Sequence, residues 1–185
     1  MPMRVHFTKV DARRYTITVE RRLGPPLVPR PGPGYDDLMP HDLAHYVVEE
    51  FFAIELGVWG QLAAGGGGIF WPAPEDNTLR HQRRVQRIGA VGRDDMARSE
   101  RLVVLTVAAW ERSIGRVRQQ TRTHDVDVDP DTQRRAVERM DEVAERWRSL
   151  PHGGSLVLDW PRELTLDLAR SRRGRRSRPA EPARR

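Results

Sequence analysis

The amino-acid sequence predicts an α+β fold in which about three helices pack on a small antiparallel sheet. Three segments with the two-residue alternation of β-strands lie near the chain ends, at residues 4–10, 15–21 and 155–160. Apolar residues between them recur with helical spacing, and strands that do not alternate with helices favour α+β over a parallel sheet. With 185 residues, the chain can bury one substantial core. We therefore predict a single α+β domain at residues 1–162.

The first two segments are expected to form an N-terminal β-hairpin. They read "RVHFTKV" and "YTITVER", and the four residues between them, "DARR", are a plausible tight connection. One face of the first strand carries Val5, Phe7 and Lys9, and it needs a covering element because an isolated hairpin is only marginally stable. Residues 24–37 follow with five prolines and three glycines. This composition excludes helix and central strand and predicts an extended loop at the domain edge.

Three helices are predicted in the middle of the chain. The first spans residues 40–56, with Pro40 at a favourable first helical position. The second begins near Asp94 or Asp95, either of which can cap a helix. The third spans residues 130–148 and has an apolar stripe at helical spacing, formed by Ala136, Met140, Val143, Ala144 and Trp147. These helices would cover one face of the predicted sheet.

The positive charge of the chain is concentrated at its C-terminal end. The net charge is +6, but residues 170–185 hold eight arginines and one glutamate, which leaves a net −1 for residues 1–169. We predict that residues 163–185 are a basic, disordered tail, because they have no apolar pattern with which to bury surface. Such a tail would bind nucleic acid or another acidic surface without sequence preference. A biased composition, with one lysine against 31 arginines, also fits a tail that has no function.

Two absences limit the class of protein. The sequence has no cysteine, which excludes disulfides, thiolate metal ligands and a cysteine nucleophile. No apolar run approaches the roughly 18 residues that a membrane span requires, and the first residues lack the apolar region of a signal peptide. We therefore expect a soluble cytoplasmic protein.

The four-glycine run at residues 65–68 is more typical of a surface loop than of a nucleotide site. It lacks the following Lys-Ser/Thr of a phosphate-binding loop, and no helix clearly opens after it. The aromatic residues on either side, Trp59, Phe70 and Trp71, are the exposed candidates for a partner-binding surface.

The segment "PHDLAHYVVEE" contains the candidate metal site. His41 and His45 are four residues apart, so on a helix they share a face, as in the H-E-x-x-H zinc motif. Asp42 takes the position of the glutamate that acts there as a base, but it is one methylene shorter. Glu49 continues the row as a further candidate ligand, although it lies about 12 Å along the axis from His41 and could instead orient His45.

A catalytic zinc site usually has a third protein ligand, which the helix does not easily supply. The candidates elsewhere are His81, His124 and the acids of "HDVDVD", residues 124–129. This acidic segment lacks the spacing of a calcium loop and is better explained as a turn with a helix cap. The competing interpretation is that His41, His45 and Glu49 form a structural row of hydrogen bonds at the edge of the core.

Four segments, "PGPGYDDLMPHDLAHYVVEE", "GVWGQLAAGG", "AAWER" and "GGSLVLDWP", are similar to small uncharacterised proteins of high-GC actinobacteria. This resemblance covers most of residues 1–160 and implies a single domain without implying an activity. The five residues of H-D-x-x-H also resemble the zincin motif. That likeness implies zinc but lacks the other motifs of those proteases.

Two functions from different classes follow from these observations. The first is a metal-binding protein of zinc type, with His41, His45 and Glu49 as the candidate ligands. Its more specific form is a hydrolase in which Asp42 is the candidate base. The alternative is a non-catalytic interaction module whose arginine tail binds nucleic acid or another acidic partner. Basic residues 80–87 would assist the tail in that role.

Overall fold

The computed structural model describes residues 1–32, 38–116 and 127–166. Its four strands form one antiparallel sheet in the order β3-β2-β1-β4. The strands are β1 (Arg4–Lys9), β2 (Tyr15–Glu20), β3 (Arg30–Pro31) and β4 (Ser155–Asp159). The predicted hairpin and C-terminal strand are therefore confirmed. The extended loop contributes the short edge strand β3, where proline is tolerated because the outer side of an edge strand needs no ladder hydrogen bond.

Five helices accompany the sheet in the described residues, which confirms the α+β class with two helices more than predicted. They are α1 (His41–Phe51), α2 (Val58–Ala63), α3 (Leu79–Val91), α4 (Arg93–Ser113) and α5 (Pro130–Arg148), together with the short 3₁₀ turns Pro74–Asp76 and Arg162–Leu164. The third predicted helix has the bounds of α5, and Asp129 caps it by accepting a hydrogen bond from the Thr132 amide (2.9 Å). None of the described helices is long and apolar enough to cross a membrane.

The sheet buries one face and leaves the other partly exposed. Phe7 pairs across the strands with Ile17 and Leu156, and all three side chains are buried. The intervening residues of each strand are half-buried or exposed, as the alternation predicts. Lys9 continues the buried face of β1, as expected from its place in the alternation.

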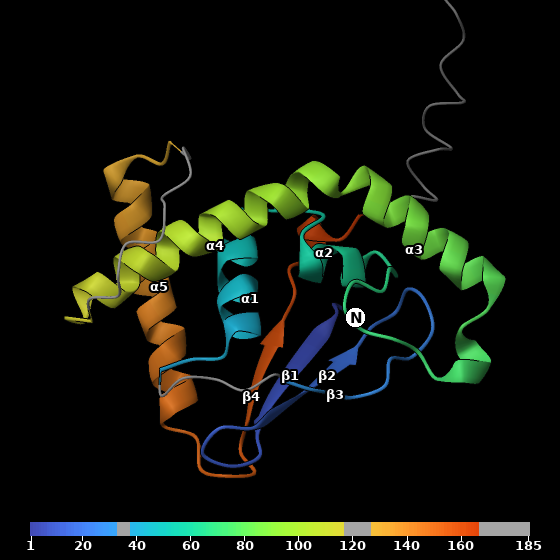
Figure 1. Cartoon of the computed structure of the whole chain (residues 1–185), viewed down its shortest axis with the longest axis horizontal. Coiled ribbons are helices and arrows are strands. Elements are labelled where there is room, and N and C mark those ends of the chain that lie inside the picture. Colours follow the sequence, from blue (N-terminus) through green and yellow to red (C-terminus); the bar gives the residue numbers. More distant parts are fainter. Residues whose placement is uncertain (33–37, 117–126, 167–185) are drawn as a thin grey trace, which may run out of the picture.

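Helices α1, α2 and α5 supply aromatic side chains that cover the buried face of the sheet. Phe7 has edge contacts with Tyr46 of α1 and Trp59 of α2, and Tyr15 has one with Trp147 of α5. Helix α4 then crosses α1 and α5 on the outside (Figure 1). Because α1 lies between the sheet and α4, residues 42–49 are buried on all sides. Of its polar residues, His45 and Glu49 therefore contact Ser99 of α4 and not solvent.

The first predicted helix is wrong at its C-terminal end, because α1 ends at Phe51. Ala53 adopts a positive φ of 51°. The Ile54 amide donates to the carbonyl of Glu49 (2.9 Å), and the Ala53 amide donates to that of Glu50 (3.3 Å). These two bonds are a Schellman ending, which usually has glycine at the position that Ala53 occupies. Because alanine is unusual at this position, the sequence does not indicate that the helix ends here.

The expectation that Trp59 and Phe70 are exposed is wrong. They are 0% and 2% exposed and pack against each other, whereas Trp71 is 63% exposed. The glycine run also differs from the predicted surface loop, since Gly65, Gly66 and Gly67 are buried. The Gly66 amide donates to the carbonyl of Gln61 (2.8 Å), which folds the loop back on α2.

Candidate functional site

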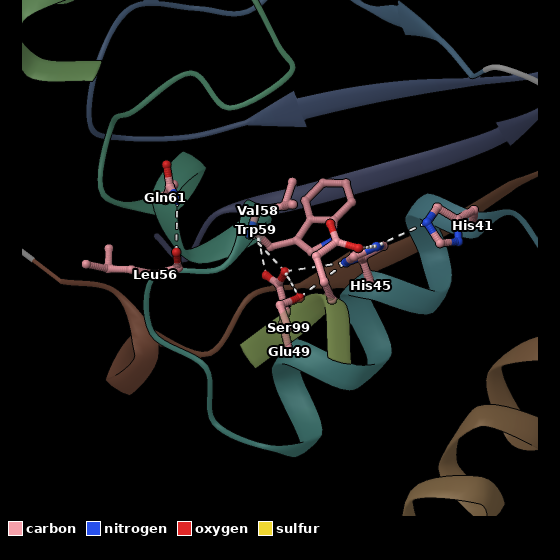
Figure 2. Close-up of polar contacts among 9 residues, drawn as sticks. His41, His45, Glu49, Leu56, Val58, Trp59, Gln61 and Ser99 are labelled. Atoms are coloured by element: carbon pink, nitrogen blue, oxygen red, sulfur yellow. Dashed lines mark hydrogen bonds and ion pairs between the residues drawn. The ribbon is translucent and has the colours of Figure 1, made fainter. Parts of the chain in front are cut away.

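The candidate site occupies the first two turns of α1, where that helix faces α4. His41 is exposed at the helix start, and His45, one turn later, is 6% exposed. Figure 2 shows a continuous row of polar side chains from His41 through His45 and Ser99 to Glu49. Ser99 belongs to α4, so the row depends on the packing of two helices.

The two histidines lie in direct contact through their Nε2 atoms. These atoms are 3.2 Å apart, and the rings are nearly perpendicular, at 87°. When both rings are neutral, one Nε2 must carry a proton and the other must offer a lone pair. The geometry of the pair thus depends on the tautomer of each ring.

The hydrogen bonds beyond His45 determine its tautomer. Glu49 is fully buried, and its carboxylate accepts from the amides of Val58 and Trp59 (both 2.8 Å) and from the Ser99 hydroxyl (2.7 Å). Because the one hydroxyl proton of Ser99 goes to Glu49, Ser99 must accept from Nδ1–H of His45 (3.2 Å). Neutral His45 is therefore protonated at Nδ1 and presents a lone pair at Nε2.

The surroundings of His41 favour its neutral form. Burial of part of the ring lowers the pKa of His41 below its usual value, and the neighbouring His45 lowers it further. The negative charges of Asp42 and Glu100 oppose this shift with smaller effects. His41 is thus suited to act as a neutral nitrogen donor near pH 7.

Asp42 lies beside the histidines in sequence, but its carboxylate contacts the sheet side of the fold. Its Oδ2 accepts from the hydroxyl of Tyr15 (2.5 Å) and from Nη1 of Arg30 (3.2 Å). Burial and the hydrogen bond to Asp42 raise the pKa of the Tyr15 hydroxyl, so this hydroxyl remains a donor. These contacts join α1 to β2 and β3, and they give Asp42 a positioning role in place of direct contact with the His41–His45 pair.

Glu49 lies on the Nδ1 side of His45, whereas the contact between the two histidines is made by their Nε2 atoms. Its two carboxylate oxygens bind the first two amides of α2 and Ser99, on the Nδ1 side of His45. Its nearest oxygen is 3.8 Å from that Nδ1. These contacts are the ones expected if Glu49 orients His45, one of the two roles predicted for it.

The predicted third ligands lie away from the two histidines or outside the described residues. His81 is on α3 beside Arg21 and Arg84, Asp129 caps α5, and His124 falls outside the described residues. Within the described parts of the chain, no three or more histidine, aspartate or glutamate side chains form a ready metal site. A further carboxylate oxygen, Oε2 of Glu100, lies 3.8 Å from Nε2 of His45.

Ser99 and Glu100 are the residues that sequence analysis missed. They form an ordinary dipeptide in a charged stretch of α4, with no motif and no fixed spacing from α1. Their importance follows only from the approach of α4 to α1. Ser99 is 0% exposed although it lies within a charged helix, and this burial can be recognised only from the structure.

The arrangement offers a pair of adjacent imidazole nitrogens, one of them oriented by a buried Ser99–Glu49 relay, with an exposed carboxylate nearby. Such a set can hold a proton between two rings or bind a cation that accepts nitrogen ligands. In comparisons with known proteins, the chain matches no family model, no curated protein and no solved structure.

Proposed function

We propose that this protein binds one divalent transition-metal ion of the zinc class through Nε2 of His41 and Nε2 of His45. The observation that supports the proposal is their separation of 3.2 Å. Two nitrogen ligands of a tetrahedral zinc ion, each at about 2.0–2.1 Å, lie roughly 3.3 Å apart. Little movement of the two side chains is therefore needed for both to reach one ion.

The relay behind His45 supports the same proposal. Histidine ligands in metal sites usually donate their second ring N–H to an oxygen acceptor, which fixes the tautomer and raises the basicity of the ligating nitrogen. His45 does this toward Ser99, and Ser99 in turn donates to Glu49. The proposal thus makes His41 and His45 the ligands and gives Glu49 an orienting role.

Glu100 is proposed as the third protein ligand, with solvent in the remaining position. Its side chain is 59% exposed, so it can rotate toward the two histidines without disturbing the core. An ion bound in this way supplies a Lewis acid and an activated water molecule, the requirement for a hydrolase. Because the Asp42 carboxylate is hydrogen-bonded to Tyr15 and Arg30, we do not propose Asp42 as the general base of a hydrolysis reaction. A cytoplasmic location is part of this proposal.

The direct test is titration of the tag-free protein with Co²⁺, followed by visible absorption and isothermal calorimetry. We expect one ion per chain and an absorption band typical of nitrogen and oxygen ligands. His41→Gln should abolish the band, because it removes one of two nitrogen ligands. His41 is exposed, so this variant should keep the fold.

His152→Gln is the matched control, since His152 is also exposed and lies outside the site. It should bind Co²⁺ as the unmodified protein does. Glu100→Gln should weaken binding without abolishing it. The absence of any cobalt band, or equal affinity in His41→Gln and the unmodified protein, would show that the histidine row is purely structural.

A further inference from the structure

A second concentration of charged side chains lies on α3, apart from the histidine row. Arg80, Arg83, Arg84 and Arg87 follow the i, i+3, i+4, i+7 spacing that places them on one face of the helix. They line a cavity of about 710 Å³. Residues at the start of the helix and in two neighbouring segments complete it, namely Gly24, Pro25, Asp76, Thr78 and His81. We call this cavity the α3 pocket.

The arginines of the α3 pocket have no carboxylate partner in the described parts of the chain, where no acidic oxygen lies within 4.0 Å of any of them. Asp76 is the acidic side chain among the described lining residues. The first turn of α3 contains no acid, although the N-terminal end of a helix carries partial positive charge. Arg80 lies in this turn, where a basic side chain is unfavourable unless an anion accompanies it.

Two buried polar atoms of the α3 pocket also lack a partner. His81 is 6% exposed, and its Nδ1 has no hydrogen bond among the described residues. Nε of Arg84 is also buried without a hydrogen-bond partner among the described residues, although Nη2 of that side chain donates to the carbonyl of Ala64 (3.0 Å). Buried groups of this kind are normally satisfied, so their presence at a pocket indicates a missing acceptor.

Arg21 adds positive charge behind the α3 pocket. Its Nη2 and Nε donate to the carbonyl of Pro25 (2.9 and 3.1 Å), so it is held by neutral acceptors. Burial and the nearby Arg84 lower the pKa of Arg21 to about 10. Burial lowers the pKa of His81 as well, and Arg21 and Arg84 lower it further. A bound anion would offset the electrostatic repulsion between Arg21 and Arg84 and would favour the protonated form of His81.

We propose that the α3 pocket binds a phosphate dianion, with Arg83, Arg84 and Arg87 as its cationic ligands and His81 as a further hydrogen-bond partner. Guanidinium groups suit phosphate because their planar N–H groups match two of its oxygens. The chemistry belongs to a terminal phosphate of a small molecule. Arg84 is half-buried and His81 is buried, so the inner end of this concave site fits the terminal phosphate of a ligand better than a continuous phosphodiester backbone.

The test is calorimetric titration of the full-length protein with inorganic phosphate in chelator-containing buffer, so that the histidine row and any metal play no part. Arg83→Gln and Arg87→Gln are the variants, because both side chains are exposed and line the pocket. Each should weaken phosphate binding about tenfold, the usual loss for one charge-assisted hydrogen bond. The matched control is Arg98→Gln, which removes an exposed arginine from α4, outside the pocket, and should leave binding unchanged.

A second measurement follows His81 directly. Phosphate should raise the pKa of the His81 ring, as seen by NMR titration, because an anion stabilises the protonated form. No phosphate binding, an equal loss in Arg98→Gln, or a His81 pKa that phosphate does not change would overturn the proposal. Binding of short duplex DNA that depends on Arg83 and Arg87, without binding of inorganic phosphate, would also overturn it and would assign this face to a nucleic-acid backbone.

Discussion

At the scale of single residues, the chemistry of the candidate site is decided by proton positions. Glu49 can only accept, Ser99 has one proton to give, and His45 must therefore hold its proton on Nδ1. The lowered pKa of His41 has a related consequence. Since protons compete less well for this ring than for a free imidazole, metal binding by His41 should persist as the pH falls somewhat below 6.5, the unperturbed value.

Ser99→Ala tests the relay. Loss of the hydroxyl leaves Nδ1–H of His45 without its acceptor and Glu49 without one of its donors. We expect Co²⁺ affinity to fall about 10- to 100-fold, the range found for residues that orient metal ligands. The free energy of unfolding should fall by about 1–3 kcal/mol, the cost of buried groups left unpaired. Calorimetry and urea denaturation measure the two effects.

Thr106→Val is the matched control for Ser99→Ala. Thr106 lies on the same helix and is 1% exposed, and its hydroxyl has no hydrogen-bond partner among the described residues. Removing that hydroxyl should leave both stability and Co²⁺ affinity near the unmodified values. A Ser99→Ala protein with full affinity would mean that the relay has no influence on the histidines.

At the scale of elements, one buried carboxylate joins three helices. Glu49 belongs to α1, caps the first amides of α2, and accepts from Ser99 of α4. The chain can make this connection because residue 57 is glycine. A Cβ atom at Gly57 would lie 2.3 Å from the carboxyl carbon of Glu49. Glycine at position 57 therefore leaves room for the Glu49 carboxylate.

Gly57→Ala should consequently destabilise the protein by about 1–3 kcal/mol, the usual cost of forcing extra atoms into a packed site. The control is Gly89→Ala in the interior of α3, where the nearest atom to a new Cβ is 3.9 Å away. This control should be neutral or stabilising, because alanine favours a helix over glycine. Thermal and urea unfolding of both variants give the comparison. Equal stabilities would show that Glu49 can move aside at little cost.

At the scale of the whole molecule, the two ends of the described chain close the fold. Strand β1 pairs with both β2 and β4, so Phe7 lies opposite Leu156. Lys9 strengthens this closure. Its Nζ donates to the carbonyls of Arg148 (3.2 Å) and Leu150 (2.9 Å) at the end of α5, and it lies over the ring of Trp147. A cation at a helix C-terminus also complements the helix dipole.

Lys9→Met tests this connection. It keeps the apolar stem but removes both hydrogen bonds and the charge, so the free energy of unfolding should fall by about 1–3 kcal/mol. Arg13→Met removes a positive charge from an exposed residue of the same hairpin and should change stability little. Urea denaturation compares the two. Similar free energies of unfolding for the two variants would mean that Lys9 contributes to stability only through its positive charge and not through its hydrogen bonds.

The predicted arginine-rich tail, residues 163–185, overlaps the described part of the chain at residues 163–166. Leu164 is buried there, in the 3₁₀ turn Arg162–Leu164. Residues 167–185 lie outside the described parts. Salt-sensitive binding of nucleic acid by the tail therefore stays a prediction from composition. It is separable from the α3 pocket, because the pocket variants leave the tail unchanged.

How far the sequence predicts an element depends on how local its cause is. Helix α5 was predicted with its observed bounds, since its cap, first proline and apolar stripe are all contained in residues 129–148. The end of α1 was missed because Ala53 takes a conformation usually left to glycine. Helix α3 was missed because its arginines hide the two buried side chains, His81 and Ile88, that face the protein.

The sequence by itself determined the α+β class, the hairpin and the placement of His41 and His45 on one helix face, because two-residue and helical spacings are local properties of the chain. Tertiary structure alone decided what surrounds them. The packing of α4 against α1 brought Ser99 and Glu100 to the histidines. The turn after α1 placed the start of α2 on Glu49, and the packing of α1 on the sheet left Asp42 with Tyr15 and Arg30. The partners lie nine or more residues away, beyond the reach of helical or strand spacing, so the local pattern does not encode their approach.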